Sequence, residues 1–238
     1  MGRAFEFRKA RKMKRWSNMS KTFTRIGREI IIAVKESGPD PSSNSRLRAI
    51  IQNAKAANMP KDNIERAIKK ASEKSSENFK EVLLEGYAPH GIAILVEAAT
   101  DNNNRTVANI RSYFNKCDGS LATSGSVDFL FDHLCFFQIK DQGIDIEELE
   151  LDLIDFGVIE LSKLENEISI TARFEDFGSI QKELERRGLE ISSSEFEREA
   201  KINKTLTEDE RLKVERLINM IDEDEDVQNV YHDMKTID

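Results

Sequence analysis

The chain has 238 residues, 39% hydrophobic and 34% charged, with a formal net charge of −8. A chain of this length can bury a sizeable core. Its longest apolar run is five residues, which is too short to span a membrane. Its two cysteines, Cys117 and Cys135, accompany no CxxC pattern and no secretory signal. These features predict a reduced, cytoplasmic protein with no membrane segment.

The charge is unevenly distributed along the chain. Residues 1–76 hold 19 Lys and Arg against 7 Asp and Glu, a net charge of +12. Residues 77–238 hold 17 against 37, a net charge of −20. This asymmetry is typical of a part that meets nucleic acid, joined to an acidic remainder. Because phosphate repels the acidic remainder, we expect binding to be confined to the first part.

Residues 1–19 form a basic arm with seven basic residues and one acidic residue. The arm is either a solvated tail or a segment that orders on a polyanion. Trp16 lies among the basic residues, where its ring would stack on bases or anchor the arm on the following domain. The second role suits Trp16 better.

Three amphipathic helices are predicted next, over 20–37, 46–58 and 61–74. Ser20 caps the first helix, and Gly38-Pro39 ends it. The first helix places Phe23, Ile26, Ile30 and Val34 on one face, and Ile32 points away from that stripe. Pro60 suits the first turn of the third helix. The basic residues mostly lie opposite the apolar stripes, where they are either merely solvated or available to a polyanion.

The pattern changes after a polar linker at 73–80. Strand, turn and strand are predicted over 81–100, followed by a helix and then a strand over 125–133. Residues 134–200 read as β-α-β-β-α-β, the order of a ferredoxin-like domain. The tail contributes a helix capped at Thr207 and a strand around 227–232, which cannot form a domain alone.

The tail is therefore predicted to complete the middle domain. The predicted fold class is α+β, with an N-terminal three-helix domain and two ferredoxin-like α/β domains, one inserted into the other. The predicted domains are a basic helical domain with its arm (1–76), a discontinuous α/β domain (77–133 plus 201–238) and an inserted ferredoxin-like domain (134–200).

Catalytic chemistry has no support in the sequence. No Walker A, GxSxG or GxGxxG motif is present, and the three histidines lack metal spacing. The acidic run Asp222–Asp226 lacks the spacing of a calcium loop, and we interpret it as a solvated helix end. Thr100–Thr106 opens a helix and is better explained by capping than by a bound anion. We expect no enzyme activity, no cofactor and no metal.

Three strings carry a family resemblance: "NAKAANMPKDNIERAIKKA", "EGYAPHGIAILVEAATDNNNRT" and "GSV". They resemble the YebC/PmpR family, which includes the mitochondrial translational activator of cytochrome c oxidase. The resemblance implies three domains and no catalysis. It also implies either a DNA-binding transcriptional regulator or a ribosome-associated translation factor. The family usually begins with a "GHSKW"-like segment, whereas this chain begins "GRAFEFRKARKMKRW".

Two functions therefore stand first. One is a DNA-binding transcriptional regulator; the alternative is a ribosome-associated translation factor that binds ribosomal RNA through the same helices. An enzyme or small-molecule sensor ranks a distant third. Phosphate contacts alone do not separate DNA from RNA, and the sequence does not indicate the oligomeric state. The candidate contacts are Lys9, Arg11, Lys12, Lys14, Arg15, Arg25, Arg28, Arg48, Lys55, Lys61, Arg66, Lys69 and Lys70.

Overall fold

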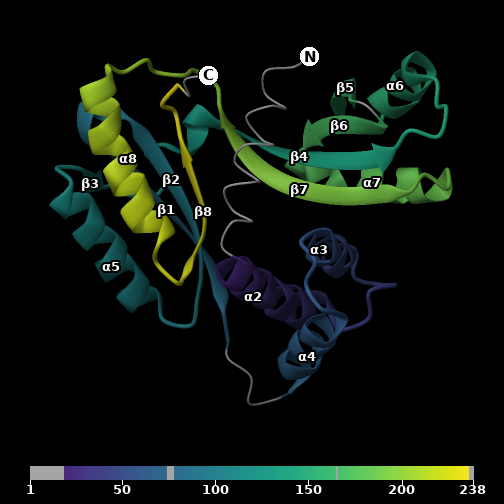
Figure 1. Ribbon diagram of the computed structural model, residues 1–238, viewed down its shortest axis with the longest axis horizontal. Helices are drawn as coiled ribbons and strands as arrows, with labels where there is room; N and C mark the ends of the chain where they lie inside the picture. Colours follow the sequence, from purple (N-terminus) through teal and green to yellow (C-terminus); the bar gives the residue numbers. More distant parts are fainter. Residues whose placement is uncertain (1–18, 74–77, 165, 236–238) are drawn as a thin grey trace. The chain divides into compact units, whose positions relative to one another are not determined.

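The computed structural model describes residues 19–73, 78–164 and 166–235 (Figure 1). Within these residues it confirms the α+β class: three helices, then two antiparallel four-stranded sheets with helices, one α/β domain inserted into the other. The chain forms two compact units. The first unit contains 1–76 and 133–197, and the second contains 77–132 and 198–238. The boundaries of the three predicted domains stay a prediction.

The helical part consists of α2 (Met19–Ser37), α3 (Ser45–Ala56) and α4 (Lys61–Ser72), with α2 packed against both other helices. Asn44 joins α2 to α3. Its buried side chain accepts from Leu47 N–H at 2.9 Å and donates to the Ala33 and Gly38 carbonyls at 2.8 Å each. One amide thus ends one helix and begins the next.

Ile32 lies off the predicted apolar stripe, yet its side chain is buried as well and only 4% exposed. All five residues from Ile30 to Val34 are buried. Residues 30–34 of α2 are therefore enclosed on every side, and a single-stripe pattern does not describe them.

The inserted domain follows the predicted β-α-β-β-α-β order. Its elements are β4 (Phe131–Lys140), α6 (Ile146–Ile154), β5 (Val158–Leu164), β6 (Glu167–Arg173), α7 (Phe177–Arg186) and β7 (Ile191–Ala200). The strand order β5-β6-β4-β7 is that of a ferredoxin-like sheet. Alternate residues of β4, such as Phe137 and Ile139, pack against Leu149 of α6 and Leu184 of α7. One face of the sheet therefore builds the core.

The second unit contains β1 (Lys80–Tyr87), β2 (Ala93–Thr100), β3 (Ser120–Leu121) and β8 (Val227–His232), in the order β3-β1-β2-β8. Helices α5 (Asn103–Lys116) and α8 (Glu208–Asp222) cover one face of this sheet (Figure 1). Ile94 and Val96 of β2 pack there against Phe114 and Leu217. Because β8 pairs antiparallel with β2, the C-terminal segment supplies the last strand of this sheet.

The predicted strand over 125–133 was wrong. A 3₁₀ helix occupies Asp128–Leu130, and β4 begins only at Phe131. The reason is Glu85, a buried carboxylate on β1 that accepts the N–H groups of Gly125 and Val127 at 2.6 Å each, and of Asp128 at 2.9 Å. Amides that converge on one carboxylate do not point into a strand ladder. The two-residue β3 pairs with β1 instead.

Replacing Glu85 with Gln is expected to cost about 2 kcal/mol of unfolding free energy at neutral pH, because charge-assisted hydrogen bonds would be lost. Burial raises the pKa of Glu85, but the N–H groups of Val127, Gly125, Asp128 and Ser126 together lower that pKa below its ordinary value of 4.5. The contribution of the carboxylate is therefore present above about pH 4.5 and is lost as the pH falls through the lowered pKa. Urea unfolding of wild type and variant at several pH values measures the difference between their free energies of unfolding.

The matched control is Glu81→Gln, on the exposed end of the same strand. The free energy of unfolding of the Glu81→Gln variant should stay close to that of the wild type. If the loss of unfolding free energy caused by Glu85→Gln grew toward acid pH, Glu85 would not act as an ionised carboxylate that holds the amides of residues 125–128.

The interpretation of Asp222–Asp226 as a solvated helix end was wrong for Asp224 and Asp226, whereas Glu223 and Glu225 are exposed. Asp226 is buried, and its Oδ2 accepts hydrogen bonds from Thr106 Oγ1 at 2.7 Å, Arg105 Nη2 at 2.9 Å and Thr100 Oγ1 at 3.1 Å. Asp224, also buried, accepts from Tyr113 OH at 3.0 Å. The string Thr100–Thr106 thus ties the start of α5 to the segment that precedes β8.

The capping interpretation of Thr100–Thr106 agrees with the structure. Asn102 is the N-cap of α5 and accepts from Arg105 N–H at 3.1 Å. Burial, together with the Asp224 carboxylate that its hydroxyl contacts, raises the pKa of Tyr113 to about 12.

Both cysteines are free and buried. Burial, together with the nearby Asp176 carboxylate, raises the pKa of Cys135 to about 12. Because the thiolate is the reactive form, we expect Cys135 to react with Ellman's reagent at pH 8 at least about 100-fold more slowly in the folded protein than in guanidinium chloride. The Cys117→Ser variant isolates Cys135 for this measurement. Equal rates in the folded and denatured protein would contradict the prediction.

Among the described helices, none combines the length and the apolar character needed to cross a bilayer.

Candidate nucleic-acid interface

Five of the predicted contacts, Lys9, Arg11, Lys12, Lys14 and Arg15, lie outside the described residues. The other eight lie on α2, α3 and α4. The three helices place them in quite different environments.

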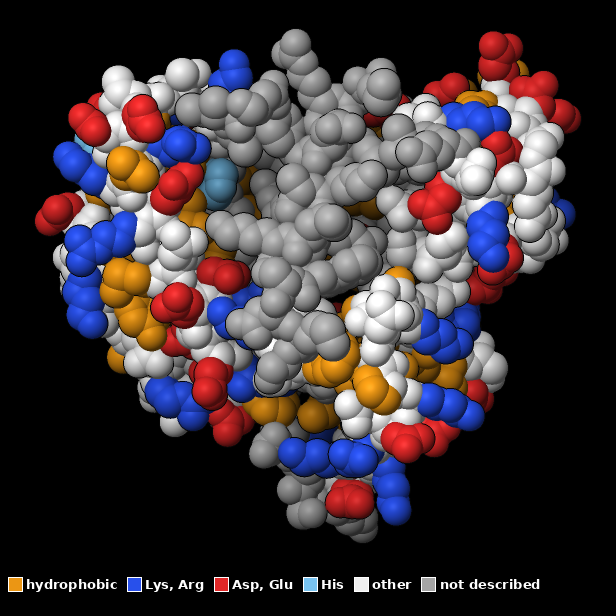
Figure 2. Space-filling view, viewed as in Figure 1, with side chains coloured by type: hydrophobic (Ala, Val, Ile, Leu, Met, Phe, Trp, Pro, Cys, Tyr) orange, Lys and Arg blue, Asp and Glu red, His pale blue; other side chains and the backbone are white. Residues whose placement is uncertain are grey.

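Helix α4 carries the densest group of exposed cations. Its inward face consists of buried Ile64 and Ala71, so that the opposite face reaches solvent. Arg66, Lys69 and Lys70 are all exposed and lie three and four residues apart, which puts them on neighbouring positions of one helical surface. We call these three residues the α4 cluster. In the space-filling view, Lys and Arg side chains gather at this end of the helical part, with some acidic side chains among them (Figure 2).

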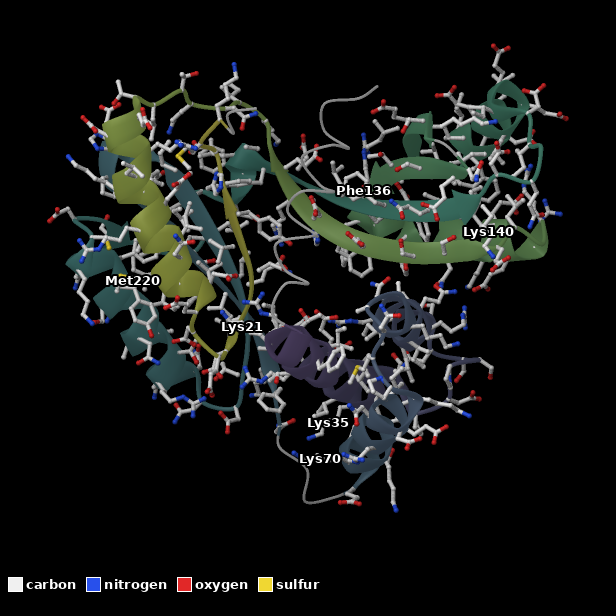
Figure 3. All side chains as sticks on the ribbon, viewed as in Figure 1. Lys21, Lys35, Lys70, Phe136, Lys140 and Met220 are labelled. Atoms are coloured by element: carbon white, nitrogen blue, oxygen red, sulfur yellow. The ribbon has the colours of Figure 1, made fainter. Side chains whose placement is uncertain are left out.

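Within the described residues 19–73, three further cations of the helical part are exposed. Lys61 begins α4 and lies 3.4 Å from Glu65, an exposed pair that contributes little to stability. Lys55 is exposed on α3. Lys35, at the end of α2, is exposed as well; in Figure 3 it projects from the same side of the α2–α4 pair as Lys70.

Arg25 and Arg28 of α2 are half-buried and so present less charge to a large ligand than the α4 cluster does. Arg48 of α3 is engaged within the protein. Its Nε lies 3.1 Å from Glu185 Oε1, and its Nη1 donates to the Pro41 carbonyl at 2.7 Å. Arg48 is therefore engaged within the protein, whereas four of the other predicted contacts, Lys61, Arg66, Lys69 and Lys70, are exposed on α4.

The net charges of the described parts differ in sign. Residues 19–73 hold 11 basic and 6 acidic residues, a net charge of +5. Residues 133–197 of the same unit hold 6 and 17, a net charge of −11. The helical part is thus the cationic part of the first unit even without the arm.

Within the parts of the chain that the structure describes, no three His, Cys, Asp or Glu side chains come together in a group that could hold a metal ion. The cationic face consists of lysine and arginine, which suit phosphate contacts.

The chain is thus an α+β protein in which a cationic three-helix part precedes two ferredoxin-like domains, one inserted into the other. The structure is similar to the crystal structure of a conserved hypothetical protein from Aquifex aeolicus. It is 37% identical, with a TM-score of 0.74, over 91% of this chain and 90% of that one. Two family models match: "TACO1/YebC protein N-terminal domain" over residues 3–74 and "TACO1/YebC second and third domain" over 79–234. The chain belongs to the TACO1/YebC family, as the sequence resemblance predicted.

Curated relatives are similar over nearly their whole length. A protein of Flavobacterium johnsoniae is 68% identical over 99% of both chains. One from Porphyromonas gingivalis is 58% identical over 99% of this chain and 98% of its own. Both are named probable transcriptional regulatory proteins.

Proposed function

We propose that this protein is a non-enzymatic regulator of transcription that binds DNA through the cationic face of its helical part. The observation that carries the proposal is the α4 cluster, three exposed cations on one helical surface of a chain whose net charge is −8. Lysine and arginine at such spacing neutralise backbone phosphates, and released counterions supply the affinity. The names of the relatives support the regulatory role.

Phosphate contacts position a protein on a duplex but carry no base sequence. The exposed residues of α4 are mainly charged, so this face supports backbone binding more directly than base readout. We therefore propose that the affinity depends steeply on salt and only weakly on sequence. Contacts to backbone phosphates suit folded ribosomal RNA equally well, and ribosomal RNA is the target of the translation-factor alternative.

Ultraviolet crosslinking in growing cells, followed by purification and sequencing of the attached nucleic acid, tests the proposal. Recovery of DNA that depends on the α4 cluster supports a transcriptional regulator. Recovery of ribosomal RNA in its place overturns the DNA assignment and supports the translation-factor alternative. A variant with Arg66, Lys69 and Lys70 replaced by Glu serves as the background control in both cases.

A further inference from the structure

Within the first unit, α3 lies against α7 and β7 of the inserted domain. Ala49 of α3 belongs to the same apolar core as Leu184 of α7. The Asn53 side chain pairs with the backbone of β7: its Oδ1 accepts from Ser194 N–H at 3.1 Å, and its Nδ2 donates to the Ser194 carbonyl. Because β7 is an edge strand, Asn53 takes the place of a neighbouring strand at that residue.

Arg48 is the main charged residue of this contact. Its Nε and Nη2 lie 3.1 and 3.4 Å from the two carboxylate oxygens of Glu185, and its Nη1 donates to the carbonyls of Pro41 and Ser42. A phosphate that approached Arg48 would have to displace the Glu185 carboxylate. The Glu185 side chain is 40% exposed, so solvent and ions reach this pair.

The contact leaves polar groups unpaired. Gln181 lies one turn before Glu185 on α7 and is fully buried, and neither atom of its amide group finds a hydrogen-bond partner among the described residues. Gln52 lies one turn after Arg48 on α3, and its Oε1 is likewise buried without a described partner. Buried polar groups without partners cost free energy. Arg48 and Glu185 thus form a matched charge pair, but neighbouring buried amide groups lack hydrogen-bond partners in the described part of the chain. Because opening the contact would expose these groups to water, the closed form is stabilised only weakly.

We propose that the inserted domain is an internal competitor for the nucleic-acid-binding face: Glu185 occupies Arg48 in the closed form, and release of α3 from α7 and β7 makes Arg48 available to phosphate. This proposal rests on the proposed function and concerns the regulation of the same site. The apparent affinity of a site that is open only part of the time is reduced by the open fraction. Weakening the contact therefore tightens nucleic-acid binding.

The test uses the full-length chain and a fluorescent random-sequence duplex of 20 base pairs, titrated by anisotropy at several salt concentrations. Glu185→Gln removes the carboxylate charge at an exposed position and keeps the shape of the side chain. We expect it to bind about 5-fold more tightly at about 0.1 M salt and to steepen the salt dependence by about 0.9, the contribution of one additional phosphate contact. Arg48→Gln in the Glu185→Gln background should cancel both gains.

Glu148→Gln, an exposed carboxylate on α6 of the same domain, makes the same charge change away from α3 and should bind as the wild type does. If the wild type binds DNA and Glu185→Gln binds equally well, the competitor role is overturned and the proposed function stands. If Glu148→Gln tightens binding as much as Glu185→Gln, the gain is one of overall charge, and the competitor role is again overturned. If none of the proteins binds the duplex even at low salt, both proposals fail.

Discussion

Replacing Arg66, Lys69 and Lys70 together with Glu is expected to weaken duplex DNA binding roughly 10²- to 10³-fold at about 0.1 M salt. Each phosphate contact contributes about 8-fold at that salt concentration, because the logarithm of the affinity falls by about 0.9 per contact for each tenfold rise in salt. The slope of log affinity against log salt should become shallower by about 3. Anisotropy titrations from low to moderate salt measure both quantities.

A matched control keeps the total charge change the same. Lys213, Arg216 and Lys235 are exposed in the second unit, and their triple replacement with Glu also changes the net charge by six. This control should lose far less affinity and keep its salt slope. If the two triple variants lose equal affinity, net charge rather than the α4 cluster determines binding, and the assignment of the interface is wrong.

Replacing Asp226 with Ala is expected to destabilise the second unit by about 3 kcal/mol. The substitution leaves the buried Thr100 and Thr106 hydroxyls without their carboxylate partner, and it removes the ion pair with Arg105 at 2.9 Å. Each hydrogen bond to a charged group contributes about 1.5–3 kcal/mol, and losses within one network are not additive. Urea unfolding followed by circular dichroism, with hydrogen exchange of β2 and β8 amides, measures the loss.

Glu223→Ala, an exposed carboxylate in the same acidic run, is the control for Asp226→Ala and should change stability by less than about 0.5 kcal/mol. Equal effects of the two substitutions would mean that general charge repulsion in this run, and not the buried network, determines its contribution.

The order of helices and strands could largely be predicted because it depends on local periodicity. In the inserted domain, for example, alternate β4 residues such as Phe137 and Ile139 face the core. Predictions failed where a distant partner decided the local structure. Residues 125–133 are not one strand, because Glu85, about forty positions earlier, binds their amides. Asp226 is buried because Thr106, 120 residues earlier, donates to it.

In the candidate site too, features that depend on local periodicity could be predicted, and features that depend on a distant partner could not. Exposure of the α4 cluster follows from the helical pattern, since Ile64 and Ala71 define the inward face. The engagement of Arg48 could not be predicted, because its partner Glu185 lies 137 positions away and looks like any other residue of an acidic helix. Asn53 likewise gave no signal that its amide would bind the edge of β7. Pairings of this kind require the fold itself.

The position of β8 has a consequence for synthesis of the chain. Ala98 of β2 pairs with Val227, so the sheet of the second unit lacks its last strand until residues 227–232 have been translated. At about 5–20 residues per second, β2 waits on the order of 10 s with one edge unpaired, while the inserted domain can already form. Premature termination before β8 would leave that apolar edge open to pairing with other chains.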